Sequence, residues 1–257
     1  MPEIYSPKVF AHRGSNTLAP ENSKPAFELA LIEGADGFET DIQLSKDLTP
    51  LLFHDDEMER IGMPSKSIDQ FYREELELLD ISMLSKEFHR FCGLLSLEDF
   101  LKSYYKKTSL LLEIKEFKNS KPKELETQIR QILNQLLAAS VNPLKVMISS
   151  FDFPILKMLN ELSSKNFIVA NIEEEKYTKD LQGLMKELPF IKGICLLNSL
   201  VNADVTAQAK SLGLKTLTYT CNTEEEIRPV VESRVDIIIS DLPGKCRKIV
   251  DKILNKQ

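Results

Sequence analysis

The chain has 257 residues, of which 42% are hydrophobic and 28% are charged, and its formal net charge is −6. This length suits one large core such as that of an α/β barrel, which takes about 250 residues, and the composition excludes a disordered chain. The acidic balance argues against nucleic-acid binding, which needs a basic face, so any bound phosphate must be held by local cations or by a metal ion.

A strand and a helix are predicted at the start of the chain. Residues 8–11 form an apolar run that ends at His12, which predicts the first strand. Residues 23–33 are predicted to be helical because Pro25 suits the first turn of a helix. Apolar residues in this segment also recur at the spacing of one helix face.

The second strand is predicted to form a hairpin with the segment that follows it. Residues 36–42 are predicted to be this strand, and its acids Glu39 and Asp41 point to the same face because they are two residues apart. Too few residues separate this strand from the apolar run 50–53 for a parallel crossover, so the pairing should be antiparallel. Residues whose numbers sum to about 95 then face each other. This register places His54 beside Asp41.

Residues 56–96 follow a different pattern, with turn signals and a helical segment over 74–84 but no alternation of strands and helices. We expect this segment to be an insertion on the side of the fold that carries the site, where functional elaboration is common. His89 lies within it near aromatic residues. It is predicted to be a packed, structural residue or to lie at the edge of a substrate site.

Strands and helices alternate through the rest of the chain. Further strands are predicted at 109–114, 145–149, 167–170, 192–196, 214–219 and 236–240. Alternation implies a parallel sheet, and eight strands in all imply an α/β fold of the closed (β/α)8 TIM type, with its site at the carboxyl ends of the strands. We expect residues 1–257 to form a single barrel domain with the insertion 56–96. Pro229 should kink or shorten the helix that it interrupts.

Three acids are predicted to gather at the mouth of this barrel. Glu39 and Asp41 end the second strand, and Glu113 ends the third. Like charges repel unless a cation joins them, and hard divalent ions prefer carboxylate oxygens. We therefore expect one divalent metal ion, Mg²⁺ or Ca²⁺, between which the sequence does not choose. The alternative is a structural salt-bridge cluster with Arg13 and Lys115.

The two histidines near strand ends, His12 and His54, are candidates for proton transfer. Imidazole titrates near neutral pH, so one of a pair can remove a proton while the other supplies one. Each could instead be a packing residue. Arg13 carries a planar fork that matches phosphate oxygens, although it could also only brace Glu39. Lys115 adds a second positive charge from the third strand.

The cysteines lack the close spacing that metal or redox chemistry needs, so reduced, buried thiols are expected at Cys92, Cys195, Cys221 and Cys246. The amino terminus has no basic stretch followed by an apolar run, and no segment reaches the roughly 18 uninterrupted apolar residues of a membrane span. We expect a cytoplasmic protein without stable membrane association. The sequence gives no prediction of the oligomeric state.

Four separated motifs occur early in the chain, namely His12-Arg13-Gly14, Pro20-Glu21-Asn22, Glu39-Thr40-Asp41 and His54-Asp55. In this order they resemble the glycerophosphodiester phosphodiesterase family. Later segments extend the similarity over nearly the whole chain: Leu112-Glu113-Ile114-Lys115, Ser150-Phe151 and residues 236–243.

The resemblance implies metal-dependent hydrolysis of glycerophosphodiesters, such as glycerophosphocholine or glycerophosphoethanolamine, to glycerol 3-phosphate and an alcohol. The roles that it implies are metal binding for Glu39, Asp41 and Glu113, acid-base catalysis for His12 and His54, and phosphate binding for Arg13 and Lys115. Phe151 and Tyr219 are expected to contact this small-molecule substrate.

Two other functions stay open. A phospholipase D-type enzyme that acts on lysophospholipids or sphingolipids would need an apolar surface, for which the aromatic residues of 56–96 are the candidates. A barrel that binds phosphate compounds without cleaving them would need no acid-base pair. The family's Asp-Gly turn is Asp47-Leu48 here and its tryptophan is replaced by Tyr219, so the preferred alcohol also stays open.

Overall fold

Eight parallel strands close into a barrel in the computed structural model, which describes residues 5–118, 120–139, 142, 145–177 and 180–254. Strand β1 pairs in parallel with both β2 and β9, and this pairing closes the sheet. The predicted (β/α)8 TIM-type barrel is therefore confirmed. Its parallel strands are β1 (Lys8–His12), β2 (Gly37–Leu44), β4 (Ser109–Ile114), β5 (Val146–Ser150), β6 (Phe167–Ile172), β7 (Gly193–Leu197), β8 (Lys215–Tyr219) and β9 (Ile237–Ser240).

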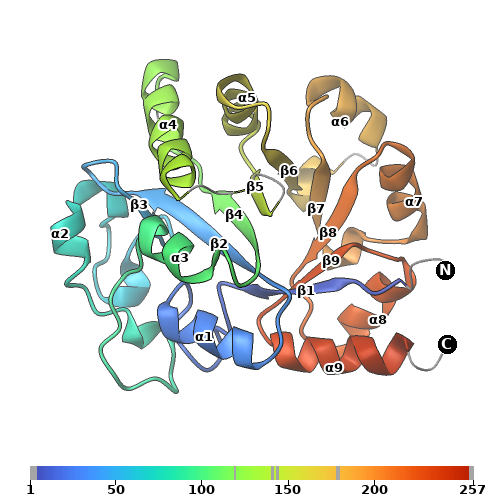
Figure 1. Ribbon diagram of the computed structural model, residues 1–257, viewed down its shortest axis with the longest axis horizontal. Helices are drawn as coiled ribbons and strands as arrows, with labels where there is room; N and C mark the ends of the chain where they lie inside the picture. The colour runs from blue at the N-terminus through green and yellow to red at the C-terminus, as the bar shows by residue number, and fades with distance from the viewer. Residues whose placement is uncertain (1–4, 119, 140–141, 143–144, 178–179, 255–257) are drawn as a thin grey trace.

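Helices surround the strands on the outside of the barrel (Figure 1). The main ones are α1 (Lys24–Ile32), α3 (Leu97–Tyr104), α4 (Pro122–Ala138), α5 (Phe153–Leu162), α6 (Leu181–Glu187), α7 (Ala203–Ser211), α8 (Glu224–Glu232) and α9 (Pro243–Leu254). Helix α1 begins where its sequence predicted, since the Ser23 side chain accepts a hydrogen bond from the Ala26 N–H and Pro25 occupies the first turn. None of the described helices has both the length and the hydrophobicity needed to cross a membrane.

Helix α8 shows where packing overrides a local signal. Thr223 and Glu226 form the capping box at its start. The helix nevertheless continues through Pro229 to Glu232, so Pro229 does not end it. Buried apolar residues on both sides of Pro229, such as Val230, offset the hydrogen bond that the proline cannot donate.

The predicted antiparallel hairpin is present between β2 and β3 (Pro50–Leu52). Its register pairs Ile42 with Leu52, so facing residue numbers sum to 94 rather than 95. Phe53 therefore lies opposite Asp41, its N–H 3.2 Å from the Asp41 carbonyl oxygen, and His54 is the next residue. The turn closes without glycine because Leu48 takes the left-handed backbone conformation, with φ +59°.

The segment 56–96, our proposed insertion, is built from short helices: η1 (Glu59–Ile61), η2 (Ile68–Gln70), α2 (Arg73–Leu76) and η3 (Ser82–Leu84). The prediction of one helix over residues 74–84 is wrong, because the chain is not helical between α2 and η3. There the Asp80 carboxylate accepts hydrogen bonds from the Ser82 and Cys92 N–H groups and holds a turn instead. His89 is exposed, so the prediction that it is a packed residue is also wrong.

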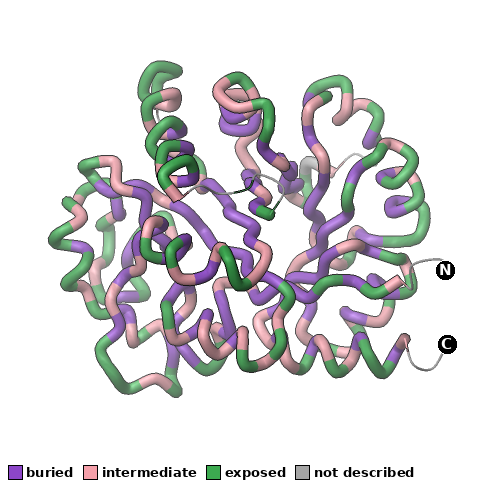
Figure 2. The backbone as a smooth tube through the Cα atoms, viewed as in Figure 1, coloured by how far each residue is buried: buried purple, intermediate pink, exposed green. Residues whose placement is uncertain are grey.

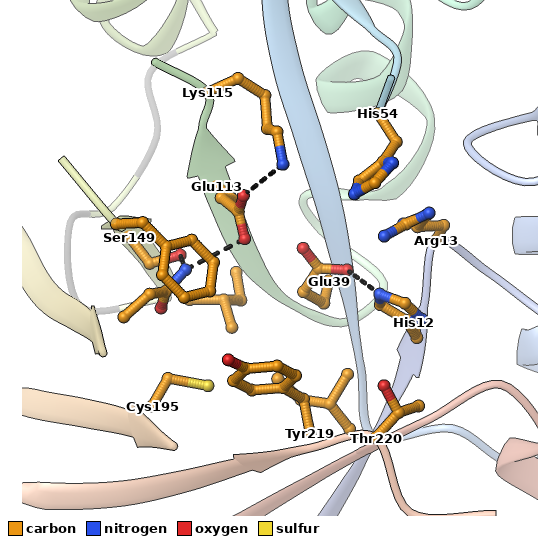
Figure 3. Close-up of a pocket in the computed structure, with 14 residues that line it drawn as sticks. His12, Arg13, Glu39, His54, Glu113, Lys115, Ser149, Cys195, Tyr219 and Thr220 are labelled. Carbon is orange, nitrogen blue, oxygen red and sulfur yellow. Dashed lines mark hydrogen bonds and ion pairs between the residues drawn. The ribbon is translucent and has the colours of Figure 1, made fainter. Parts of the chain in front are cut away.

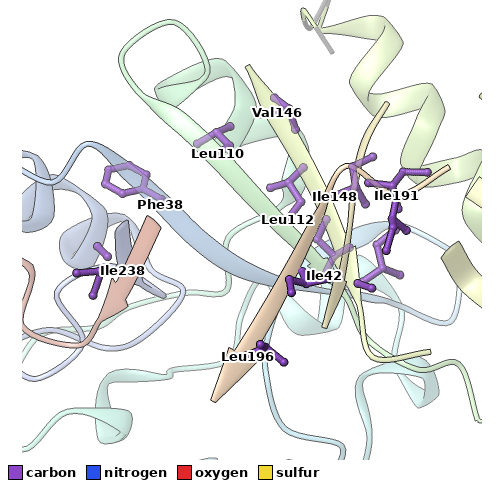
Figure 4. Packing of buried hydrophobic residues seen from close by; sticks show 14 of the residues in the cluster. Phe38, Ile42, Leu110, Leu112, Val146, Ile148, Ile191, Leu196 and Ile238 are labelled. Atoms are coloured by element: carbon purple, nitrogen blue, oxygen red, sulfur yellow. The ribbon is translucent and has the colours of Figure 1, made fainter. Parts of the chain in front are cut away.

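The described residues form three apolar clusters. The largest lies between the strands and the surrounding helices, where Ile42, Leu112 and Ile148 pack together (Figure 4). A second cluster is the core of segment 56–96. A third fills the barrel interior with Phe10, Leu111, Val169, Cys195, Leu217, Ile237 and Ile239. Buried residues follow the strands while exposed ones lie on the outer faces of the helices (Figure 2).

Side chains of a strand alternate between its two faces, so the interior cluster locates the site. In β1 the inward Phe10 is followed two residues later by His12, and in β4 Leu111 is followed by Glu113. The barrel interior is thus filled by apolar side chains, and ionisable side chains line it at the carboxyl ends of the strands. All four cysteines are buried and free, as the sequence predicted.

Gly14 allows the loop after β1 to pack against α1. Its φ is +87°, and a Cβ atom there would lie 2.6 Å from the Ala26 backbone carbon. We expect Gly14→Ala to lower the free energy of unfolding by about 1–3 kcal/mol because of backbone strain. The clash with Ala26 should add a further loss. Gly34 has a similar φ of +82° but open space around it, so Gly34→Ala is a control for strain alone. Equal losses for the two variants in urea denaturation would contradict the clash.

Candidate active site

Three buried acids lie together at the carboxyl ends of β2 and β4. Parallel pairing sets Asp41 opposite Glu113, and Glu39 lies two residues earlier on the same face of β2. Carboxylate oxygens of the three residues lie within 4.8 Å of one another. Figure 3 shows Glu39 and Glu113 facing the same pocket. The strand ends thus bring together the acids that the sequence singled out.

The charges of this cluster are not balanced by the protein alone. Burial, together with the neighbouring Asp41 and Glu113, raises the pKa of Glu39 well above its usual range. Burial and Asp41 also raise the pKa of Glu113. Burial opposes ionisation of Asp41 as well, but Arg13, Lys115 and His54 outweigh it and lower its pKa to about 2.

The donor set fits a divalent cation. Glu39 Oε2 is buried and has no hydrogen-bond partner among the described residues, so it has an open acceptor position. Carboxylate oxygens are the ligands that Mg²⁺ and Ca²⁺ prefer. A bound dication would also favour the ionised forms of Glu39 and Glu113, whose pKa values are raised by burial and by the neighbouring acids.

Two cations flank the acids. The Arg13 guanidinium lies 3.0 Å from Asp41 Oδ2 and 3.1 Å from Glu21 Oε1. The alternative that Arg13 only braces Glu39 does not describe its ion pairs, which join it to Asp41 and Glu21. The Lys115 ammonium lies 2.8 Å from Glu113 Oε1. Both cations also line the pocket, where they can contact a substrate anion.

His12 is held in one orientation by an acid from the far end of the chain. Its Nδ1 lies 2.6 Å from Asp241 Oδ1, and its Nε2 lies 3.9 Å from Glu39 Oε2. An ionised carboxylate only accepts hydrogen bonds, so Nδ1 carries the proton and Nε2 is directed into the pocket. Asp241 accepts two further hydrogen bonds, from Asn16 and Asn222.

His54 has a similar arrangement on the other side of the acids. Its Nδ1 lies 2.8 Å from Asp55 Oδ1. Burial opposes ionisation of Asp55, but hydrogen bonds from His54 and Arg60 outweigh it and lower the pKa of Asp55. The ionised Asp55 therefore accepts the Nδ1 proton, which leaves Nε2 of His54 for the pocket. Both imidazoles border the same cavity (Figure 3).

The pocket is a cavity of about 280 Å³. Every site residue predicted from the sequence lines it except Asp41, which is buried beneath it. The rings of Phe151 and Tyr219 form an edge-to-face pair with centroids 6.1 Å apart. Both rings line the pocket and give it an aromatic wall, and Tyr219 lies on the side away from Arg13 and His54 (Figure 3).

Several supporting side chains were not predicted. Asn22 donates to Asp41 at 2.9 Å, and Asn171 donates to Glu113 at 3.0 Å. Asn22, Asp55 and Asp241 could have been identified from the sequence, since each belongs to a motif or to a strand end. Asn171, in β6, had no such signal, because its proximity to Glu113 depends on β5 lying between the two strands.

A model of the glycerophosphoryl diester phosphodiesterase family matches residues 12–245. The chain is 29% identical to the YhdW protein of Bacillus subtilis (strain 168), over 91% of this chain and 94% of that protein. It is 27% identical to a glycerophosphodiester phosphodiesterase of Bacillus altitudinis, over 96% and 99% of the two chains.

A solved structure with the same fold is the phosphodiesterase OLEI02445 of Oleispira antarctica, in complex with its product sn-glycerol-3-phosphate. The two structures superpose with a TM-score of 0.83 at 25% sequence identity, over 96% of this chain and 97% of that one.

The contacts of Asp241 predict a pH-dependent contribution to stability. Burial opposes its ionisation, but the hydrogen bonds from His12, Asn16 and Asn222 lower its pKa to about 2. This is below the unfolded value of about 3.9, so the ionised form stabilises the fold at neutral pH. That contribution is lost as the pH falls from about 4 to about 2.

We therefore expect Asp241→Asn to unfold at lower urea concentration than the wild type at pH 7. The difference between the two proteins should shrink as the pH approaches 2. A difference that is the same at pH 7 and at pH 2.5 would contradict this electrostatic role.

Proposed function

The chain belongs to the glycerophosphoryl diester phosphodiesterase family, and from this membership we propose that it hydrolyses glycerophosphodiesters to glycerol 3-phosphate and an alcohol with the help of one divalent metal ion. The observation that carries the proposal is the buried acid cluster with a histidine on each side of it, all around one cavity. The alternative of a barrel that only binds phosphate compounds gives no reason for two imidazoles with carboxylate partners.

The metal ligands in this proposal are Glu39, Asp41 and Glu113, and the ion is Mg²⁺ or Ca²⁺. When bound, the ion supplies positive charge that stabilises the nonbridging phosphate oxygens. Arg13 and Lys115 hold the same phosphate group from the protein side. Their existing ion pairs with the acids fix both cations at the edge of the cavity.

Proton transfer falls to His12 and His54. Nε2 of His12 accepts the proton of the glycerol 2-hydroxyl, whose oxygen then attacks phosphorus. The bond between phosphorus and the alcohol oxygen breaks, and His54 donates a proton to that oxygen. Water then opens the cyclic phosphate, with the histidines in reversed roles, to give glycerol 3-phosphate. The assignment of base and acid to the two histidines could be reversed without altering the rest of the scheme.

The preferred alcohols in this proposal are choline and ethanolamine, which makes glycerophosphocholine and glycerophosphoethanolamine the substrates. The aromatic wall of Phe151 and Tyr219 supports this choice, because a ring face attracts an ammonium group. Burial raises the pKa of Tyr219, and Cys195, Glu113, Glu173 and Glu175 raise it further.

A second candidate function is a phospholipase D-type reaction on lysophospholipids or sphingolipids. Large apolar side chains on segment 56–96 support it, since Leu78 is 80% exposed and Phe91 is 65% exposed. The compartment that we propose is the cytoplasm. Free thiols at all four cysteines are typical of a reducing environment.

Loss of either imidazole should remove most of the activity. We expect His12→Ala and His54→Ala each to lower kcat by about 10²–10⁴-fold, the usual contribution of general acid-base catalysis. His89→Ala is the matched control, because His89 is exposed and does not line the cavity. The assay is release of glycerol 3-phosphate from a panel of glycerophosphodiesters, together with release of choline from lysophosphatidylcholine.

The same assay tests the metal. Chelator should abolish activity, and Mg²⁺ or Ca²⁺ should restore it in the wild type but not in Glu39→Gln. Near-normal turnover by both histidine variants would overturn the mechanism. Faster cleavage of lysophosphatidylcholine than of glycerophosphocholine would favour the second candidate function.

Tyr219 should determine discrimination between alcohols. We expect Tyr219→Ala to reduce the preference for glycerophosphocholine over glycerophosphoglycerol by about 2- to 10-fold, since a cation–π contact contributes about 0.5–1 kcal/mol or more. Tyr219→Phe keeps the ring and should retain the preference. Equal ratios of kcat/KM for the wild type and Tyr219→Ala would show that the ring does not contact the cationic group.

A further inference from the structure

Segment 56–96 contacts the candidate active site through Arg60. This residue lies in η1, and its neighbours Met58 and Ile61 are buried in the core of the segment. The Met58 N–H donates to the Lys66 carbonyl at 2.7 Å, and the Met63 N–H donates to the Met58 carbonyl at 3.1 Å. The backbone that carries Arg60 is thus anchored on both sides.

The guanidinium of Arg60 binds two carboxylates at once. It donates two hydrogen bonds to Glu21, at 2.7 and 3.1 Å. It donates two more to Asp55, of which the one to Oδ1 is 2.8 Å long. Only the planar fork of arginine can donate in pairs to two acids in this way, because the three donors of a lysine diverge from one nitrogen.

Each of these acids contacts a residue of the proposed catalytic machinery. Asp55 accepts from Nδ1 of His54, and Glu21 accepts from Nη1 of Arg13 at 3.1 Å. Arg60 therefore joins the loop after β1, which carries Glu21, to the residues after β3, which carry His54 and Asp55.

The same contacts explain a second acidic cluster. Glu21, His54 and Asp55 offer ligand atoms within 4.8 Å of one another, as a metal site would. The positive charge between the two acids is however already supplied by Arg60, which forms ion pairs with both. Without Arg60 the two carboxylates would repel each other, and the side chains that they orient would lose a fixed partner.

We propose that Arg60 is a positioning residue, which fixes the ring of His54 through Asp55 and the guanidinium of Arg13 through Glu21. This inference rests on the proposed function, in which His54 and Arg13 act on the substrate. The Arg60 side chain is 44% exposed. Its ion pairs therefore contribute little to global stability, whereas misplacement of an oriented catalytic group is costly for rate.

The kinetic test compares Arg60→Gln with Arg73→Gln. Arg73 is a matched control because it lies in the same segment, has a side chain that is 35% exposed and pairs with Glu77 and Glu98. We expect Arg60→Gln to lower kcat/KM for glycerophosphocholine by about 10- to 100-fold, as is usual for partners of a catalytic group. Arg73→Gln should stay within about twofold of the wild type. Both melting temperatures should remain close to that of the wild type.

A spectroscopic test follows His54 directly. The chain has three histidines, so their ring N–H signals in ¹⁵N NMR can be assigned with single His→Ala variants. Arg60→Gln should weaken or shift the Nδ1–H signal of His54, while that of His12, bonded to Asp241, stays unchanged. Arg60→Lys keeps the charge without the double fork and should restore only part of the activity.

The inference is overturned if Arg60→Gln is as active as Arg73→Gln, or if its activity falls while the His54 signal is unchanged. It is also overturned if both Arg60 variants fail to fold, because Arg60 would then be a determinant of the fold. A wild type that cleaves no glycerophosphodiester contradicts the proposed function instead, and the NMR comparison still decides the role of Arg60.

Discussion

The burial of three carboxylates at one end of the barrel is the constraint on which the rest of the site depends. Glu39, Asp41 and Glu113 are buried, so the protein must supply most of their partners. Arg13 and Lys115 provide two positive charges, and amides provide further hydrogen bonds. Burial and the neighbouring acids nevertheless raise the pKa of Glu39 and of Glu113, and an additional cation would favour their ionised forms.

The two histidines beside the acids follow one pattern, in which an imidazole that faces the pocket is oriented by a partner outside it. His12 and His54 are each bonded through Nδ1 to a carboxylate, Asp241 and Asp55 respectively. This leaves both Nε2 atoms for the cavity. Asp55 follows β3 and Asp241 follows β9. Segment 56–96 contributes a further partner, Arg60, which donates to Glu21. Segment 56–96 thus contributes both its own core and an ion-pair connection to the site.

The fold and most of the site could be predicted because their signals are local. Period-two alternation within β2 sets Glu39 and Asp41 on one face, and the short connection after β2 forces an antiparallel hairpin. Predictions were wrong where a local signal competed with other contacts. The helix expected over residues 74–84 is interrupted by the turn at Asp80, and His89, although close to aromatic residues in sequence, is exposed.

The sequence by itself determined the eight strands, the hairpin and the set of ionisable residues at the strand ends, because strand periodicity and connection length are properties of short stretches. Only the tertiary structure decided which of these residues pair. Asp241 is 229 residues from His12, and Glu21 is 39 residues from Arg60. Such contacts depend on the closure of the barrel and on the path of segment 56–96, and neither leaves a periodic pattern in the chain.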